Sequence, residues 1–170
     1  MGFISTRQLF LLMFIACVCL LGAAYYFEYV MFLDPCPLCI MQRIAVLLLG
    51  LIGFSGFMFA INPFREKIHS ALLFAASLFG IGIAGRHVWI QSLPADQVPT
   101  CGPSLEYMVD TLPLAEVLTV MFRGNGNCAD AQWSFIGLSM PQWVLVWFVG
   151  FAVVSVVMFI LAGKKQAETL

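Results

Sequence analysis

The chain has 170 residues, of which 62% are hydrophobic and 10% are charged, and its formal net charge is −1. Soluble domains carry about 25% charged residues, so this composition excludes an ordinary soluble domain and indicates an integral membrane protein. The small net charge also argues against nucleic acid as a partner.

The first apolar run covers residues 9–27. At about 1.5 Å per residue, a helix of this length can span the hydrocarbon core of a bilayer. Arg7 before the run and the small residues Gly22-Ala23-Ala24 also resemble a cleaved signal peptide. The apolar core of a signal peptide is usually shorter, about 7–15 residues, and aromatic residues continue this run beyond the alanines. We therefore expect a retained helix that ends in an interfacial aromatic belt.

Three further apolar runs predict helices over residues 40–61, 70–90 and 142–162. Within the third run of the chain, Ala76, Gly80 and Ala84 recur at every fourth position, which allows a neighbouring helix to approach closely. We expect one membrane domain over residues 1–170, an all-α bundle of four transmembrane helices.

Lysine and arginine near the ends of the runs predict the orientation. One side of the predicted bundle carries Arg7, Arg65, Lys67, Lys164 and Lys165. The other side carries Arg123, with Arg43 and Arg86 at its membrane boundary. The first side is therefore expected to be cytoplasmic, with both termini. The loops over 28–39 and 91–141 then lie outside, in the periplasm of a Gram-negative cell, where disulfides persist.

A Cys-x-x-Cys pair, Cys36 and Cys39, directly precedes the second run, and Pro37 suits the first turn of a helix. The unpaired N–H groups and the dipole at a helix N-terminus favour a thiolate, the reactive form of cysteine. Arg43 lies one turn beyond Cys39 on the same face and adds a positive charge, whereas Gln42 points off that face and receives no role. By itself the motif is compatible with redox chemistry, metal binding or plain structure.

Two more cysteines, Cys101 and Cys128, lie in the second outer loop. A structural disulfide is one interpretation. Their proline-rich and glycine-rich surroundings favour a second one, a labile disulfide open to thiol exchange. A four-cysteine zinc site is the third, but 26 residues separate these two cysteines, far from the tight spacing of zinc ligands. Cys17 and Cys19, in the first run, are interpreted as small core or lipid-facing residues.

A short amphipathic helix is predicted between the two loop cysteines. Its apolar residues recur at helical spacing: Leu114, Val117, Leu118, Met121 and Phe122. Pro113 suits its first turn. We expect this helix to lie in the membrane interface with its apolar side down, with packing against the bundle ends as the alternative.

Three motifs together carry a resemblance to a known family. They are Asp34-Pro35-Cys36-Pro37-Leu38-Cys39-Ile40-Met41-Gln42-Arg43, the separated pair Cys101 and Cys128, and residues 127–143, which contain Trp-x-Phe-x-Gly and Met-Pro-Gln-Trp. With them the chain resembles the DsbB family, disulfide bond formation protein B, a family of bacterial inner-membrane thiol:quinone oxidoreductases. The resemblance extends from the first helix to the fourth.

The resemblance implies an electron relay that sustains disulfide bond formation. A reduced periplasmic thioredoxin-like oxidant of the DsbA type attacks a Cys101–Cys128 disulfide and forms a mixed disulfide with Cys101. Cys128 then passes the reducing equivalents to Cys36, and Cys39 faces a membrane quinone, ubiquinone or menaquinone, with no metal. An oxidant near −120 mV needs an acceptor of still more positive potential, and a quinone fits this demand.

The resemblance also implies a quinone site. Arg43 matches the family arginine that holds the quinone. Arg86 and His87 lie near the outer end of the third run and are further candidates, since an ionisable residue at membrane depth suggests function, with interfacial anchoring as their alternative. Two other functions stay open: a transmembrane carrier of reductant from the cytoplasm, and a non-catalytic membrane protein with a structural loop disulfide.

Overall fold

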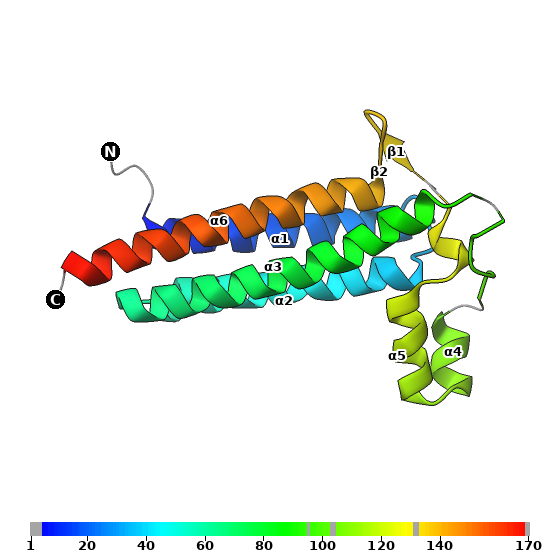
Figure 1. The fold of residues 1–170 in the computed structure, drawn as a ribbon, viewed down its shortest axis with the longest axis horizontal. Coiled ribbons are helices and arrows are strands. Elements are labelled where there is room, and N and C mark those ends of the chain that lie inside the picture. Colours follow the sequence, from blue (N-terminus) through cyan, green and yellow to red (C-terminus); the bar gives the residue numbers. More distant parts are fainter. Residues whose placement is uncertain (1–4, 95, 103–104, 131–132, 169–170) are drawn as a thin grey trace.

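The computed structural model describes residues 5–94, 96–102, 105–130 and 133–168. Ala131 and Gln132, within the last motif, lie outside the described residues. Four long helices run side by side (Figure 1): α1 (Thr6–Tyr29), α2 (Pro37–Phe59), α3 (Pro63–Gln91) and α6 (Met140–Glu168). Each is long and apolar enough to cross a membrane, so the predicted four-helix membrane fold is confirmed.

The helices begin earlier than the apolar runs because polar and proline residues start them. Ser5 caps α1 and forms a reciprocal capping box with Gln8. Cys36 caps α2, and its sulfur accepts a hydrogen bond from the N–H of Cys39. Pro63 occupies the first turn of α3. A hydrophobic pattern marks the membrane-embedded part of a helix, whereas these caps mark where the helix itself starts.

Small residues on α3 form the contact with α6, as the fourfold spacing predicted. Ala76 and Ala84 are buried. At Gly80, an added Cβ would lie 2.3 Å from the ring of Phe148, a residue of α6. Helix α1 packs on α2, and α2 packs on α3, but α1 and α6 touch little. The bundle is therefore most open between α1 and α6.

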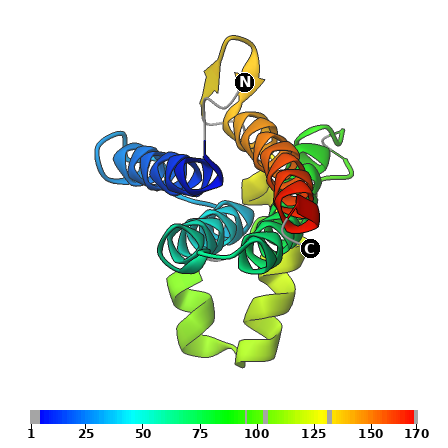
Figure 2. The same cartoon turned by 90° about the vertical axis from the view of Figure 1, so that its left-hand side faces the viewer.

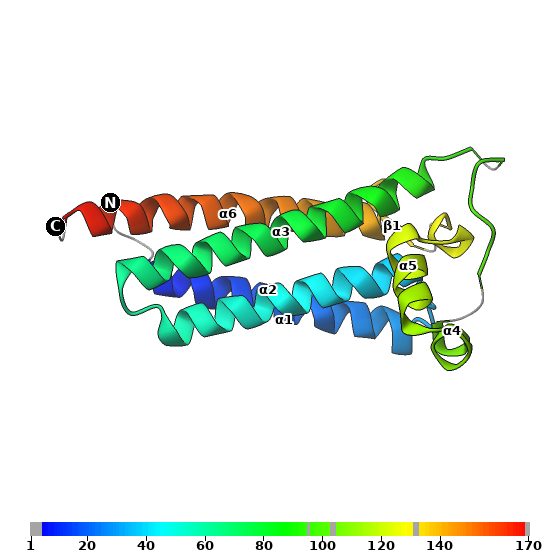
Figure 3. The same cartoon turned by 60° about the horizontal axis from the view of Figure 1, so that its bottom comes forward.

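The two ends of the bundle differ. The described ends of α1 and α6 meet at one end, called here the terminus end, where Lys165 contacts Glu66 at 3.1 Å and Thr6 at 2.8 Å. The opposite end, called here the cysteine end, carries the two longer connections (Figures 1 and 3). This antiparallel arrangement places both connections that contain the loop cysteines on the same side.

The second connection folds into α4 (Leu105–Thr111), α5 (Leu114–Arg123), the 3₁₀ turn η1 (Gly126–Cys128) and a hairpin of β1 (Ser134–Phe135) and β2 (Leu138–Ser139). Figure 2 shows α4 and α5 projecting from the α2–α3 side of the bundle and the hairpin from the α1–α6 side. The predicted amphipathic helix is present as α5. Neither α4 nor the hairpin was predicted from the sequence.

Candidate functional site

The first cysteine pair is held by the start of α2. The sulfur of Cys36 lies 3.1 Å from the sulfur of Cys39 and can donate its hydrogen to it. The N–H of Cys39 lies 3.4 Å from the sulfur of Cys36. Cys36 is buried and Cys39 is partly exposed. The helix N-terminus therefore brings the two sulfurs close enough for a disulfide to form after a small adjustment.

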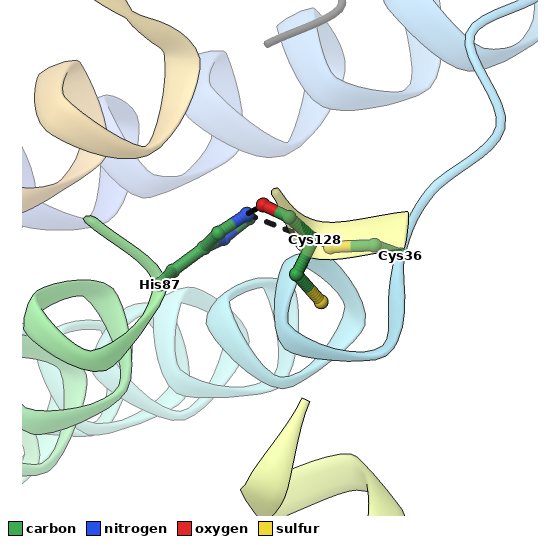
Figure 4. A group of neighbouring side chains, drawn as sticks. All are labelled: Cys36, His87 and Cys128. Atoms are coloured by element: carbon green, nitrogen blue, oxygen red, sulfur yellow. Dashed lines mark hydrogen bonds between the residues drawn. The ribbon is translucent and has the colours of Figure 1, made fainter. Parts of the chain in front are cut away.

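The turn η1 brings Cys128 onto this pair. Cys128 is buried, and its N–H donates to the carbonyl of Asn125 at 3.0 Å. The sulfurs of Cys36 and Cys128 and the ring nitrogen of His87 all lie within 4.8 Å of one another (Figure 4). Residues far apart in the sequence thus form one thiol cluster, defined here as Cys36, Cys39 and Cys128.

Within the cluster, two thiols share a proton unequally. The Cys36 thiol donates a hydrogen bond that lowers the pKa of Cys128 to about 6, with help from backbone N–H groups and against the effect of burial. Cys36 has one S–H, which it can direct to Cys128 or to Cys39; these two acceptors, together with burial, raise the pKa of Cys36 above its ordinary value. For Cys36, these effects outweigh the helix N-terminus, which was expected to favour its thiolate.

The fourth loop cysteine lies at the surface beside the same turn. Cys101 is exposed. The N–H of Gly126 donates to the carbonyl of Thr100 at 3.2 Å. A Cβ added to Gly126 would lie 2.9 Å from the sulfur of Cys101, so glycine permits this close approach. The structure thus places an accessible thiol next to the turn that carries the buried Cys128.

Arg43 lies on α2 and turns toward α1. One terminal nitrogen of its guanidinium forms an ion pair with the carboxylate of Glu28, and the other donates to the carbonyl of Ala24 at 3.2 Å. The ring of Tyr25 lies 5.2 Å from the guanidinium carbon. Glu28 was not predicted as a site residue. These contacts hold the cation of Arg43 beside the open side of the bundle.

Two adjoining pockets lie along that open side. The first, of about 60 Å³, is lined by Cys39, Gln42 and Arg43. The second, of about 270 Å³, lies between α1 and α6. Its aromatic lining consists of Phe27, Trp133, Phe135, Trp143 and Trp147. Both pockets are lined by Leu20, Ala24, Met140 and Val144. An apolar, aromatic space therefore leads from the membrane face of the bundle to Cys39 and Arg43.

His87 and Arg86 are adjacent on α3, but their side chains contact different parts of the protein. His87 is buried between Gln42, whose Nε2 lies 3.2 Å from its Nδ1, and the Cys128 carbonyl, 3.1 Å from its Nε2. Arg86 donates from Nε to the carbonyl of Arg123 at 3.0 Å and is not among the residues that line the two pockets. The contact between Gln42 and His87 was missed, although a glutamine inside an apolar run is itself a signal, because a buried amide needs a partner.

Cys36, His87 and Cys128 also have the donor types and the proximity of a metal site. A carbonyl oxygen only accepts hydrogen bonds, so the Nε2 of His87 that contacts the Cys128 carbonyl carries a hydrogen and is not placed as a ligand. The arrangement fits thiol chemistry better. Cys17 is buried against Gly50 and Cys19 is exposed on α1, both apart from the cluster.

Fold and site together define a multi-pass membrane protein with thiols clustered at one end of a four-helix bundle. The model of the family described as disulfide bond formation protein DsbB matches residues 6–158. Disulfide bond formation protein B of Nitrosococcus oceani is 49% identical over 152 residues, 89% of this chain and 90% of that protein. The Hahella chejuensis protein of the same name is 45% identical over 90% of this chain and 93% of its own length. Disulfide bond formation protein B 1 of Pseudomonas aeruginosa is 43% identical over 92% of this chain and 96% of its own length. The chain therefore belongs to the DsbB family and has a role in disulfide bond formation.

Proposed function

We propose that this protein reoxidises a periplasmic thioredoxin-like oxidant of the DsbA type and passes the electrons to a membrane quinone, ubiquinone or menaquinone. The observation that carries the proposal is the placement of Cys128 against Cys36, since it brings sulfur atoms of the two loops within 4.8 Å of each other. A purely structural disulfide between Cys101 and Cys128 does not require this contact with the first pair.

The relay begins at the exposed Cys101. A thiolate of the reduced partner attacks Cys101 in the Cys101–Cys128 disulfide, forms a mixed disulfide, and releases Cys128 as a thiolate. That thiolate attacks Cys36 in the Cys36–Cys39 disulfide and releases Cys39 as a thiolate. The second thiol of the partner then displaces Cys101, which leaves the partner oxidised.

Two further steps restore the starting state. The released Cys101 thiolate attacks Cys128 in the Cys36–Cys128 disulfide, which re-forms Cys101–Cys128 and leaves Cys36 and Cys39 as a dithiol. The chemistry that a quinone supplies when bound beside Cys39 is acceptance of two electrons and two protons from this dithiol. Over the cycle, the partner loses two electrons and two protons, and the four cysteines are unchanged.

The pockets between α1 and α6 support the choice of acceptor. The aromatic lining of the larger pocket suits a flat ring that arrives laterally from the lipid. Arg43 would hold the ring there, and Glu28 would orient the guanidinium. Both ring nitrogens of His87 are engaged, by Gln42 and by Cys128, so we assign His87 a role in supporting the thiol cluster and not in holding the quinone. Arg86 keeps the anchoring role that its contact with Arg123 supports.

The membrane orientation is part of the proposal. We place the cysteine end in the periplasm and the terminus end, which carries Arg7, Lys164 and Lys165, in the cytoplasm of a bacterial inner membrane. Leu114, Leu118 and Phe122 of α5 are exposed, and Phe122 contacts Phe79 of α3 edge to face. This exposed apolar stripe would rest on the lipid surface.

A coupled assay tests the proposal. The purified protein, in vesicles, is mixed with a reduced DsbA-type protein and a short-chain ubiquinone analogue. One quinol should form per partner disulfide, and serine at any of the four loop cysteines should stop both products. Cys17→Ser and Cys19→Ser are the matched controls and should retain turnover. Quinol formation at the normal rate in Cys36→Ser would overturn the relay.

A further inference from the structure

A buried hydrogen-bond chain joins α2, α3 and η1 beneath the thiol cluster. It consists of Gln42, His87 and the main-chain carbonyl of Cys128. We propose that Gln42 and His87 form a latch that fixes the Cys128 turn on the end of the bundle, so that the Cys128 sulfur stays within reach of Cys36. The latch itself is a structural claim, and its consequence for electron transfer rests on the proposed function.

The positions of the hydrogens on the His87 ring follow from the two groups that it contacts. The Cys128 carbonyl only accepts, so the Nε2 of His87, 3.1 Å away, must carry a hydrogen. Nδ1 lies 3.2 Å from the Nε2 of Gln42, an amide nitrogen that only donates, so Nδ1 must accept. One form of the ring satisfies both contacts: the neutral imidazole with its hydrogen on Nε2. Gln42 therefore selects the tautomer that can hold Cys128.

Burial makes these two hydrogen bonds consequential. Gln42 is 5% exposed, His87 is 2% exposed and Cys128 is 1% exposed, so water does not replace a lost partner readily. Breaking one bond would leave a buried polar group unsatisfied, which is costly. Cys128 also packs in an apolar cluster with Leu38, Ile83 and Ile90, but such contacts are not directional. The internal bonds of the turn, such as that from the Cys128 N–H to Asn125, do not fix its position on the bundle.

The geometry also explains why the latch acts on the thiols. The same Nε2 lies 3.7 Å from the sulfur of Cys36 (Figure 4). Its N–H therefore faces both the Cys128 main chain and the Cys36 sulfur, and holds the two loops in one arrangement. Among the described residues, the Gln42 side chain forms its hydrogen bond with His87 and none with a cysteine, so Gln42 is a positioning residue that acts through His87.

Two substitutions separate the latch from general packing. Gln42→Leu keeps the approximate size but cannot donate to Nδ1. Gln42→Glu accepts a hydrogen from Nδ1 instead, which favours a doubly protonated ring whose Nε2 still donates to Cys128. The latch therefore predicts that the Cys128 turn is released in the leucine variant and stays fixed on the bundle in the glutamate variant. Gln91→Leu is the control, because the Gln91 side chain accepts a hydrogen bond from Ser139 of β2 at 2.7 Å.

The first readout is the accessibility of the Cys128 thiol in the fully reduced protein, measured by alkylation followed by mass spectrometry. Gln42→Leu and His87→Phe should speed alkylation roughly tenfold, in line with the loss of one buried hydrogen bond. Gln42→Glu and Gln91→Leu should keep the wild-type rate. A wild-type rate in Gln42→Leu would overturn the latch.

The second readout is the ¹⁵N spectrum of the ring, which reports which nitrogen carries hydrogen. The chain has two histidines, so His69→Gln leaves His87 as the one ring signal. The wild-type ring should show the Nε2–H tautomer, and hydrogen on Nδ1 would overturn the latch even if Gln42→Leu does not fold. Neither readout needs the partner or the quinone. The latch can therefore fail while the relay stands, and the relay can fail while the latch stands.

Discussion

At the scale of single residues, the decisive feature is the unequal sharing of a proton between Cys36 and Cys128. A hydrogen bond from Cys36 stabilises the Cys128 thiolate, whose pKa falls to about 6. Cys128 is thus ionised near neutral pH in the reduced protein, where Cys36 is a thiol. The raised pKa of Cys36 keeps its sulfur protonated near neutral pH when Cys36 is reduced.

This sharing predicts a pH titration. In a variant that retains Cys36 and Cys128 as its cysteines, thiolate ultraviolet absorbance should appear with a midpoint near pH 6. The thiolate is present above this midpoint and is protonated as the pH falls through it. The midpoint lies this low because the folded protein lowers the pKa of Cys128. Cys36→Ala should move the Cys128 midpoint upward, toward about 8.5 or beyond. An unchanged midpoint in Cys36→Ala would show that Cys36 is not the donor.

Arg43 and Glu28 predict a separation of two Michaelis constants. Arg43→His should raise the constant for the quinone analogue about tenfold, the size expected for a lost charged hydrogen bond, and leave that for the partner nearly unchanged. Glu28→Gln should raise the quinone constant less, about threefold, because it frees the guanidinium without removing it. Steady-state kinetics in vesicles provide the measurement. A normal quinone constant in Arg43→His would contradict the assignment of Arg43.

The predictability of the site differs between its residues. Cys36, Cys39 and Arg43 could be proposed from the sequence because their motif lies within one segment, and Cys101 and Cys128 because both lie in the second outer loop. Glu28 and Gln42 were missed because spacing along one helix shows which residues share a face, but not what a second helix presents to that face. Gln42 lies off the face of Arg43, as expected, and it is there that α3 places His87.

At the scale of elements, close helix contact is what the small residues provide. The ring of Phe148 rests directly on Gly80, where an added Cβ would come within 2.3 Å of it. At Gly82, two residues further along α3, an added Cβ meets nothing within 4 Å. One helix thus offers a crowded glycine and a free one.

These two glycines predict opposite effects on stability. Gly80→Ala should lower the free energy of unfolding by about 1–3 kcal/mol, because the buried Phe148 must move. Gly82→Ala should be neutral or stabilising by up to about 1 kcal/mol, since alanine favours a helix more than glycine does. Thermal unfolding in detergent measures both variants. Equal stability of the two would contradict the packing of α3 on α6.

Helix α5 shows where a sequence pattern stops being informative. The spacing predicted one apolar face with two alternative surroundings, and the structure divides that face. Val117 and Met121 are buried in the cluster that contains Cys36 and Cys128, whereas Leu118 and Phe122 are exposed. The β1–β2 hairpin was not predicted, because strands of two residues are too short to show a period.

At the scale of the whole molecule, the antiparallel bundle fixes which features share an end. The helix count followed from the apolar runs, and the gathering of three cysteines could not, because it depends on how η1 docks between α2 and α3. Helix α1 touches α6 little, which leaves the space beside Cys39 open on the membrane side. The two proposed substrates would therefore reach the thiols from different directions.

The proposed orientation predicts asymmetric labelling. In intact spheroplasts whose cysteine thiols are kept reduced, a membrane-impermeant maleimide should label Cys101. In a variant with the native cysteines replaced, Lys164→Cys should react only after the membrane is opened, because the positive-inside rule places it in the cytoplasm. Labelling of Lys164→Cys in intact spheroplasts, with Cys101 protected, would reverse the orientation.

In the proposed relay, sulfur in the second loop passes its electrons to sulfur in the first, and one experiment measures this transfer directly. The oxidised protein is mixed with a reduced DsbA-type protein whose second cysteine is alanine, then quenched with acid, digested and analysed by mass spectrometry. The account predicts the partner on Cys101 together with a peptide that links Cys36 to Cys128, and no such link in Cys36→Ser. A partner bound to Cys101, with Cys128 left as a free thiol and Cys36 still joined to Cys39, would contradict it.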